Sequence, residues 1–241
     1  MDQLEPMPDD WTSALAVAAH PDDLEYGAAA AIAAWTDAGK DVRYLLVTRG
    51  EAGIDTMPPA EAGPLREAEQ RASAAVVGVS EVEFLDHPDG VIEYGTALRR
   101  DMSAAIRRHR PELIVTGNYR DQWPGGGWNS PDHRNVSRAV LDAVADAGNR
   151  WIFPELVERG LEPWRGVRYV AIGGSAAASH AVDVSATMDR GVASLEAHKV
   201  YLEALGDHPL GSAREFLEWI AGLAADRFGG RPAVAFELVR L

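Results

Sequence analysis

The 241-residue sequence contains no cysteine. Disulfide bonds and thiolate metal sites are therefore excluded, and any bound metal must be held by His, Asp, Glu or water. The sequence also lacks an apolar run approaching the roughly 20 residues that cross a bilayer. Residues 1–11 lack the basic and then apolar segments of a signal peptide. These absences predict a soluble, cytoplasmic protein with no membrane partner.

Basic residues are scarce relative to acidic ones. The chain has 23 Lys and Arg against 37 Asp and Glu, a formal net charge of −14. Nucleic acids need clustered positive charge, so we expect no nucleic acid partner. We expect a single domain over residues 1–241, because α/β folds often reach this length undivided. A homo-oligomer is compatible with the sequence, although nothing in it marks an interface.

Short apolar runs alternate with helical patterns through a core at residues 13–150. Strands are predicted at residues 13–18, 41–48, 82–85 and 113–116, and helices at residues 27–37, 64–77, 96–109 and 132–147. This alternation is typical of a three-layer, Rossmann-like α/β fold with a mostly parallel sheet and helices on both faces. In the C-terminal extension, 151–241, we expect a strand at 166–172, helices at 187–205 and 213–227, and a closing strand at 233–241. The extension is expected to lengthen the sheet and wall the site.

One imidazole and two carboxylates directly follow the first predicted strand, in the run Ala19-His20-Pro21-Asp22-Asp23. In an open parallel sheet, ligands bind beyond the carboxyl ends of the strands. One division of roles places His20 and Asp23 on a metal and leaves Asp22 free to take up a proton. In the alternative, Asp22 or Asp23 only caps the following helix.

A second polar run, Ser130-Pro131-Asp132-His133, follows the fourth predicted strand at the start of a helix. By the same rule it opens at the same edge of the sheet, where His133 could join His20 and Asp23. Two His and one carboxylate are a common ligand set for catalytic zinc, with a fourth position open to water. Alternatively, Asp132 caps the helix and His133 lies on the surface.

The two runs together resemble the LmbE-like/PIG-L family of zinc-dependent N-deacetylases. The resemblance rests on His-Pro-Asp-Asp followed by a distant Pro-Asp-His, and it covers residues 14–145 in order and spacing. Smaller motifs that fit the family are Thr48-Arg49-Gly50-Glu51, Arg66 with Glu69, Asp89-Gly90, Arg110-Pro111-Glu112 and Ala197-His198. Each motif is weak alone, and their ordered combination carries the resemblance.

The resemblance implies that His20, Asp23 and His133 bind Zn²⁺ and that Asp22 is the general base. Fe²⁺ or another divalent ion could replace zinc, because a nitrogen and oxygen site selects weakly between such ions. The implied activity is hydrolysis of an N-acyl group, first of all N-acetyl, on a small amino-sugar conjugate. Sugar contacts are expected from Arg49, Arg66 and Asp89. Arg66 and Glu69 could instead form an ordinary ion pair on a helix surface.

Two positions depart from the family pattern. Ser130 stands where the family usually has a His that is thought to act as an acid or oxyanion stabiliser, and Trp128 stands near the place of a Tyr in some relatives. Losing such a stabiliser typically lowers the rate by roughly 10²–10³. We expect Ser130 not to touch the metal ligands and activity to survive in altered form. Replacement donors are sought among His87, Asn118 and Asn129.

The glycine-rich loop at residues 117–131 carries Trp123 and Trp128. Their rings could stack on a sugar or on an aromatic aglycone, or they could pack against their own domain. Trp128 is therefore a predicted substrate contact. Ser130, at the end of the same loop, is predicted to contact the substrate as well.

Two other functions stay open. One is amidase action on a larger thiol-sugar conjugate, which the modest chain length disfavours. The other is a sugar-binding relative with little or no turnover. Ser130 supports that second alternative, whereas Asp22 argues against it, because a pure binding protein has no use for a general base.

Overall fold

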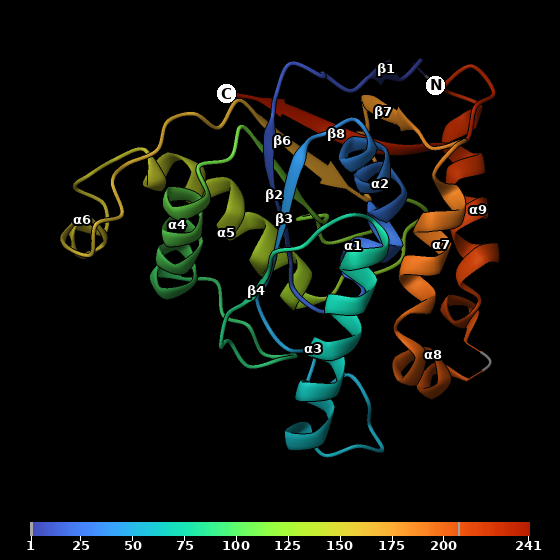
Figure 1. Ribbon diagram of the computed structural model, residues 1–241, viewed down its shortest axis with the longest axis horizontal. Coiled ribbons are helices and arrows are strands. Elements are labelled where there is room, and N and C mark those ends of the chain that lie inside the picture. The colour runs from blue at the N-terminus through green and yellow to red at the C-terminus, as the bar shows by residue number, and fades with distance from the viewer. Residues whose placement is uncertain (1, 207) are drawn as a thin grey trace.

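The computed structural model describes residues 2–206 and 208–241, so Met1 and Asp207 of the predicted domain span lie outside the described residues. The described residues form one mixed sheet in which the strands follow the order β1-β7-β8-β6-β5-β2-β3-β4 (Figure 1). In chain order the strands are β1 (Glu5–Pro6), β2 (Ser13–Ala18), β3 (Asp41–Leu46), β4 (Val82–Phe84), β5 (Leu113–Thr116), β6 (Tyr169–Gly173), β7 (His180–Asp183) and β8 (Ala233–Arg240).

The sheet is mostly parallel, as predicted. Among the described strands, only β8 runs against its neighbours, β6 and β7. From β2 the chain moves outward through β3 to β4, then crosses over to β5 and continues to β6 on the other side. The strand order therefore reverses between β2 and β5. In open α/β sheets, a ligand-binding crevice lies beyond the carboxyl ends of the strands at such a point.

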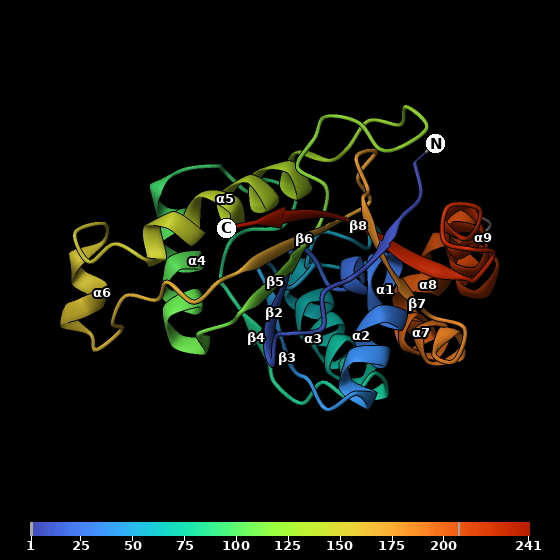
Figure 2. The ribbon, with the colours of Figure 1, turned by 90° about the horizontal axis from the view of Figure 1, so that it is seen from above.

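Helices cover both faces of the sheet and produce the three predicted layers (Figure 2). In β2, Ala14 and Ala16 pack in one apolar cluster, whereas Leu15 and Val17 pack in another. Successive strand side chains point to opposite faces, so a strand that is apolar throughout needs cover on both. The first face is covered by α1 (Asp23–Gly27), α2 (Ala29–Asp37), α3 (Pro59–Val76), α7 (Met188–Glu196) and α9 (Ala213–Ala225), and the second by α4 (Thr96–His109) and α5 (Pro131–Ala147).

Three helices differ from their predicted extents by more than two residues. The helix expected at 27–37 begins earlier and is divided at Ala28 into α1 and α2. The helix expected at 64–77 begins at Pro59, so Pro64 lies inside α3. The single helix expected at 187–205 is wrong: α7 ends at Glu196, and α8 (Lys199–Leu205) follows after a break. The break lets the intervening His198 turn fully into the interior.

Several short elements were not predicted from the sequence. These are β1, β7, α6 (Pro154–Glu158) and the 3-10 turn η1 (Pro209–Gly211). Each spans too few residues to display a period of its own. Within the described ranges, every helix is too short or too polar to cross a bilayer.

Candidate active site

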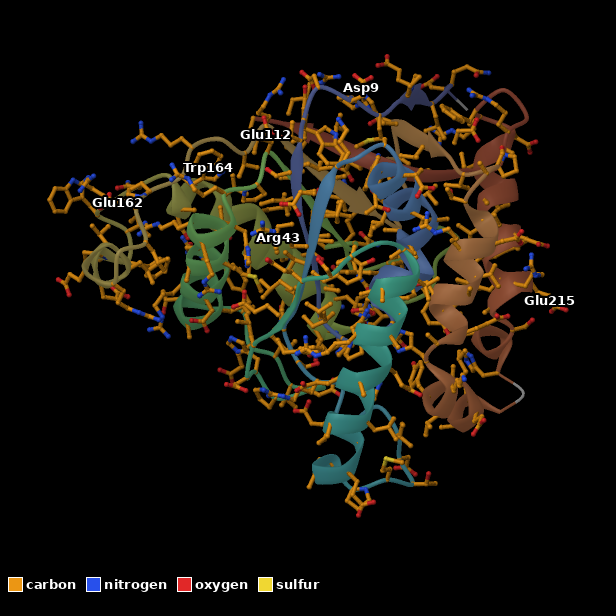
Figure 3. All side chains as sticks on the ribbon, viewed as in Figure 1. Asp9, Arg43, Glu112, Glu162, Trp164 and Glu215 are labelled. Atoms are coloured by element: carbon orange, nitrogen blue, oxygen red, sulfur yellow. The ribbon has the colours of Figure 1, made fainter. Side chains whose placement is uncertain are left out.

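The segment after β2 and the start of α5 meet at the carboxyl edge of the sheet. Asp9 and Glu112, which precede β2 and β5, are labelled on the upper side of Figure 3, so both strands run away from that side. The runs 19–23 and 130–133 lie beyond the other ends of these strands. Both polar runs found in the sequence therefore lie where the strand order reverses.

Three side chains converge there. The Nε2 atom of His133 lies 3.0 Å from Oδ1 of Asp23, and Nδ1 of His20 lies 3.5 Å from Oδ2 of the same carboxylate. One ligand atom from each of the three residues falls within 4.8 Å of the others. Two imidazole nitrogens and a carboxylate at this spacing could hold a divalent metal ion.

His20 is oriented by carboxylates on its far side. Its Nε2 atom lies 3.1 Å from Oδ1 of Asp89 and 3.2 Å from Oδ2 of Asp132. Asp132 also accepts hydrogen bonds from the backbone N–H groups of Gly90 and Ile92. With Nε2 engaged, Nδ1 is the nitrogen left to face Asp23. Carboxylates that fix a ligating imidazole in this way are common around metal sites.

His133 is oriented by a buried amide. Its Nδ1 atom lies 3.1 Å from Oδ1 of Asn129. The Nδ2 group of Asn129 donates to the backbone carbonyls of Asn118 and Arg120, which leaves the amide oxygen as the acceptor for His133. A hydrogen of the imidazole is thereby placed on Nδ1, and Nε2 is the nitrogen that faces Asp23 and is available to a metal ion. Asn129, sought as a replacement donor to the substrate, is committed to this network.

The carboxylates of this cluster strongly stabilise positive charge on its imidazoles. Burial lowers the pKa of His20, but Asp23, Asp132 and Asp89 outweigh burial and hold that pKa well above its ordinary value. Burial raises the pKa of Asp23, but the imidazoles of His133 and His20 hold it well below its ordinary value. Metal binding displaces the protons of such ligands. The donor set and its charge therefore fit a divalent cation.

The side chain of Asp22 points in a different direction from that of its neighbour Asp23. Its backbone is left-handed, with φ of 92°, and its side chain makes no cap hydrogen bond to α1. Its Oδ2 atom lies 3.2 Å from Nη2 of Arg66, and its backbone N–H donates to Oε1 of Gln70. Burial raises the pKa of Asp22 to about 6 against the opposing charge of Arg66. The alternative in which Asp22 only caps the helix is wrong.

Arg66 lies behind Asp22 and not on a helix surface. Its side chain is 3% exposed and donates to the backbone carbonyls of Pro21 and Gly50. A Cβ atom on Gly50 would come within 2.6 Å of Nη1 of Arg66, so this close approach requires glycine. The ring of Tyr201 covers the guanidinium, 4.0 Å from Cζ to the ring centroid. The surface ion pair of Arg66 with Glu69 is wrong.

Ser130, and not Asp132, caps α5. The backbone N–H of His133 donates to Oγ of Ser130 over 3.2 Å, so the expectation that Ser130 would not touch a predicted ligand is wrong. The reason is local, because a serine at the N-cap reaches the third residue of its helix. Asp132 is released from capping and turns inward to His20.

The other predicted residues lie around this centre at different depths. Asp89 has a 6% exposed side chain, held between His20 and the backbone N–H of Ala52. Arg49 pairs with Glu67 and Asp86, and His87 pairs with Asp101, outside the His20, Asp23 and His133 group. Trp128 is 68% exposed, with the guanidinium of Arg134 over its ring.

A buried polar network behind Asp22 was missed by the sequence reasoning. Gln70 accepts from the backbone of Asp22 and donates to Oε1 of Glu25, which also accepts from Ser73. The Nε2 atom of His198 lies 3.6 Å from Oε2 of Glu25. A signal was available, because residues 66, 70 and 73 recur at the spacing of one helix face.

A family profile described as "PIG-L: GlcNAc-PI de-N-acetylase" matches residues 15–144. Among curated proteins, the chain is 29% identical over 188 residues to a diacetylchitobiose deacetylase from Thermococcus kodakarensis, covering 77% of this chain and 68% of the relative. It is 34% identical over 164 residues to a 1D-myo-inositol 2-acetamido-2-deoxy-alpha-D-glucopyranoside deacetylase from Kineococcus radiotolerans, covering 54% of this chain and 44% of the relative. The match thus spans less than half of that second relative.

Solved structures share the fold. The N,N'-diacetylchitobiose deacetylase of Pyrococcus horikoshii superimposes with a TM-score of 0.87 at 22% identity, covering 96% of this chain and 85% of the other. The 4-carboxy-2-hydroxymuconate hydratase of Pseudomonas putida KT2440 superimposes with a TM-score of 0.77 at 20% identity, covering 95% and 97%. At these identities the likeness establishes the fold, and the fold has hosted more than one kind of chemistry.

Proposed function

The chain belongs to the PIG-L family of GlcNAc-PI de-N-acetylases, and from this premise we propose that it is a metal-dependent hydrolase that removes an N-acyl group, first of all N-acetyl, from an amino-sugar conjugate. The observation that carries the proposal is the convergence of His20, Asp23 and His133 beside the buried carboxylate of Asp22. The two curated relatives described above are both named as deacetylases, and the substrates in their names are acetylated amino sugars.

His20, Asp23 and His133 are proposed to hold Zn²⁺ or another divalent ion. When bound, such an ion polarises the amide carbonyl and lowers the pKa of water to roughly 7. Asp132, Asp89 and Asn129 keep the two imidazoles turned so that one nitrogen of each faces the common point.

Asp22 is proposed as the general base. A base works best when its pKa lies near the working pH, and burial brings the pKa of Asp22 to about 6. Asp22 takes a proton from the attacking water and afterwards returns one to the nitrogen of the leaving amine. Arg66 and Gln70 hold the residue in place during both transfers.

Ser130 is proposed to donate a hydrogen bond to the substrate in place of the imidazole common in the family. Its oxygen is used as an acceptor in the cap of α5, so its hydroxyl proton is left for a second partner. Arg66 and Asp89, predicted as sugar contacts, are proposed instead to position Asp22 and His20, because their side chains are almost completely buried. Arg49 and Trp128 remain proposed substrate contacts.

Acetate release from a panel of N-acetylglucosamine conjugates tests the proposal directly, which matters because the fold alone does not separate amide hydrolysis from hydration. We expect turnover by the metal-loaded protein and a loss of roughly 10²–10⁴ in Asp22→Asn, the range of general-base catalysis. Asp189→Asn, an exposed carboxylate on α7, is the matched control.

Two results would change the proposal. Acetate release by the wild-type protein no greater than that by Asp22→Asn would rule out enzymatic activity. Retained binding of the sugar would then favour the sugar-binding alternative. Elemental analysis tests the ligand set separately: we expect about one metal ion per chain, lost in His133→Ala, and full retention in that variant would refute the assignment. Turnover confined to conjugates with a bulky thiol-bearing aglycone would favour the amidase alternative.

A further inference from the structure

The loop between β5 and α5 folds as a short hairpin. Its tip is the yellow-green segment that projects from the layers in Figure 2. Gln122 and Trp128 form an antiparallel bridge, and the backbone N–H of Trp123 donates to the carbonyl of Gly127 over 2.7 Å. Gly125 and Gly126 make the turn with φ of 93° and 97°. The loop therefore has a defined hairpin shape that can form a wall of the site.

The base of this hairpin is tied to the candidate metal centre. Asn118 donates from Nδ2 to the carbonyl of Gln122, and Asn129 donates to the carbonyl of Asn118. The same Asn129 accepts from Nδ1 of His133. The position of the hairpin and the orientation of His133 are consequently set by one network.

Trp123 bridges two elements of the site. Its ring lies 5.7 Å from the ring of His133, centroid to centroid, in an edge arrangement at 73°. Its benzo edge lies on Gly174, directly after β6, where an added Cβ would come within 2.6 Å of Cζ3. Gly174 has φ of 64°, so a larger residue is excluded there on two counts. The indole is half-buried.

The two tryptophans of the hairpin face opposite ways. Gln122 and Trp128 are directly paired, so their side chains share one face, and the adjacent Trp123 lies on the other. Trp128 is exposed, with the guanidinium of Arg134 over its ring, whereas Trp123 faces His133. The sequence predicted Trp128 as the substrate contact, whereas in the structure it is Trp123 that lies against His133.

We propose that Trp123 is the specificity-determining wall of the sugar subsite, where its indole face stacks on the C–H face of the pyranose ring. This inference rests on the proposed function, since the sugar is brought to Trp123 by binding of its amide at the His20, Asp23 and His133 centre. An aromatic face carries partial negative charge and attracts the partly positive C–H groups of a sugar. An indole also matches a pyranose ring in area.

The sugar is assigned to this wall because of where solvent lies. Asp22, on one side of the centre, is buried against α3. On the other side, residues 124–128 next to Trp123 are exposed. The small acyl group is assigned to the closed side, and the larger sugar with its aglycone to the path that leads toward solvent. Trp123 lies on that path.

The experiment uses the two halves of the product as separate probes. Binding of glucosamine and of acetate to the metal-loaded Asp22→Asn protein is measured by calorimetry, with and without Trp123→Ala. We expect glucosamine to bind about tenfold more weakly without the indole, the loss of one aromatic contact, and acetate to bind unchanged. Trp123→Phe should recover part of the loss. Trp151→Ala, an exposed tryptophan remote in sequence, is the matched control.

The possible outcomes are distinct. Weaker acetate binding with unchanged glucosamine binding would overturn the inference and assign Trp123 to the acyl side. Equal binding of both probes by all proteins would also overturn it, as would a loss that follows Trp128→Ala instead. Metal content measured in every variant separates a wall from a mere support of His133, because a support would lose metal. If the wild-type protein releases no acetate and binds neither probe, the proposed function fails, and this inference fails with it.

Discussion

The backbone of Asp22 is in a conformation that residues other than glycine seldom adopt. A left-handed residue costs roughly 1–2 kcal/mol, and such strain persists only where the surroundings hold it. Here Gln70 accepts from the backbone and Arg66 pairs with the carboxylate. The strained turn separates two successive aspartates, so that Asp23 faces the imidazoles and Asp22 does not.

Gln70 is expected to position Asp22 without touching substrate. Gln70→Met keeps the side-chain length but removes the acceptor for the Asp22 backbone. We expect kcat to fall about tenfold, one lost hydrogen bond of the usual net strength, with KM and metal content unchanged. Steady-state kinetics and elemental analysis check this, with the exposed Gln3→Met as control. A change in KM alone would contradict it.

Arg66 is expected to set the acid limb of the pH profile. Burial raises the pKa of Asp22 to about 6, and the charge of Arg66 opposes that rise. Because the base must be ionised, kcat/KM falls as the pH drops through this pKa. Arg66→Gln removes the opposing charge, so the pKa rises further and the acid limb moves to higher pH. Arg66→Lys should move it less.

The comparison of the Arg66 variants is made at equal metal loading, because a bound cation also lowers the pKa of Asp22. If the acid limb of the pH profile stays in place or moves to lower pH in Arg66→Gln, a group other than Asp22 controls it.

At the scale of elements, α3 builds the closed side of the site. It begins at Pro59, and its residues 66, 70 and 73 line one buried polar face behind Asp22. A buried polar face looks, in sequence, like the solvent face of an ordinary amphipathic helix. Arg66 was therefore open to interpretation as half of a surface ion pair, and Gln70 attracted no notice.

A second element-scale feature joins α4, α5 and α6. Arg107, on α4, is buried and donates to backbone carbonyls at the end of α5, in the following loop and just after α6. These are the carbonyls of Ala147, Asp146, Asn149, Ile152 and Leu161. The last carbonyls of a helix lack partners within the helix and attract positive charge. Arg107 donates to two of these carbonyls, those of Asp146 and Ala147, which also accept from the backbone N–H groups of Asn149 and Trp164.

Arg107→Met should lower the free energy of unfolding by about 3 kcal/mol, because it removes the hydrogen bonds that a buried guanidinium donates to five backbone carbonyls. Denaturant unfolding measures the change, and Arg100→Met, on the exposed side of the same helix, should change it by less than about 0.5 kcal/mol. Equal effects of the two substitutions would contradict the role given to Arg107.

At the scale of the whole molecule, the C-terminal extension completes the sheet and the site. β6 pairs with β5, and β8 continues the sheet from β6. α7 and α8 bring His198 and Tyr201 to the buried network behind Asp22. Phe236 of β8 packs in the same apolar cluster as β2. Residues from both parts of the chain therefore share one core and one site.

The prediction of one domain over residues 1–241 follows from that sharing. We expect a single unfolding transition in which the calorimetric and van't Hoff enthalpies agree. A fragment of residues 1–150 would expose the edge of β5 and half of an apolar cluster, so it should fail to fold and should aggregate. Two separate transitions, or a soluble folded fragment, would contradict a single domain.

The sequence was sufficient for the α/β class, the parallel core and the two polar runs that meet at the switch point. These properties depend on local periodicity and on the rule that parallel strands end at one edge, and both can be read along the chain. The family resemblance added roles for His20, Asp22, Asp23 and His133 that no spacing could supply.

Tertiary structure decided what each polar side chain faces. Asp132 turned to His20 because Ser130 took over the cap, and Arg66 turned to Asp22 because Gly50 left room for it. The break at His198 arose because that residue is buried against Glu25, 173 positions earlier in the chain (198 − 25). Contacts between residues so distant in sequence leave no periodic pattern in the chain. The direction in which each side chain points, and how deeply it is buried, were therefore set only when the layers packed.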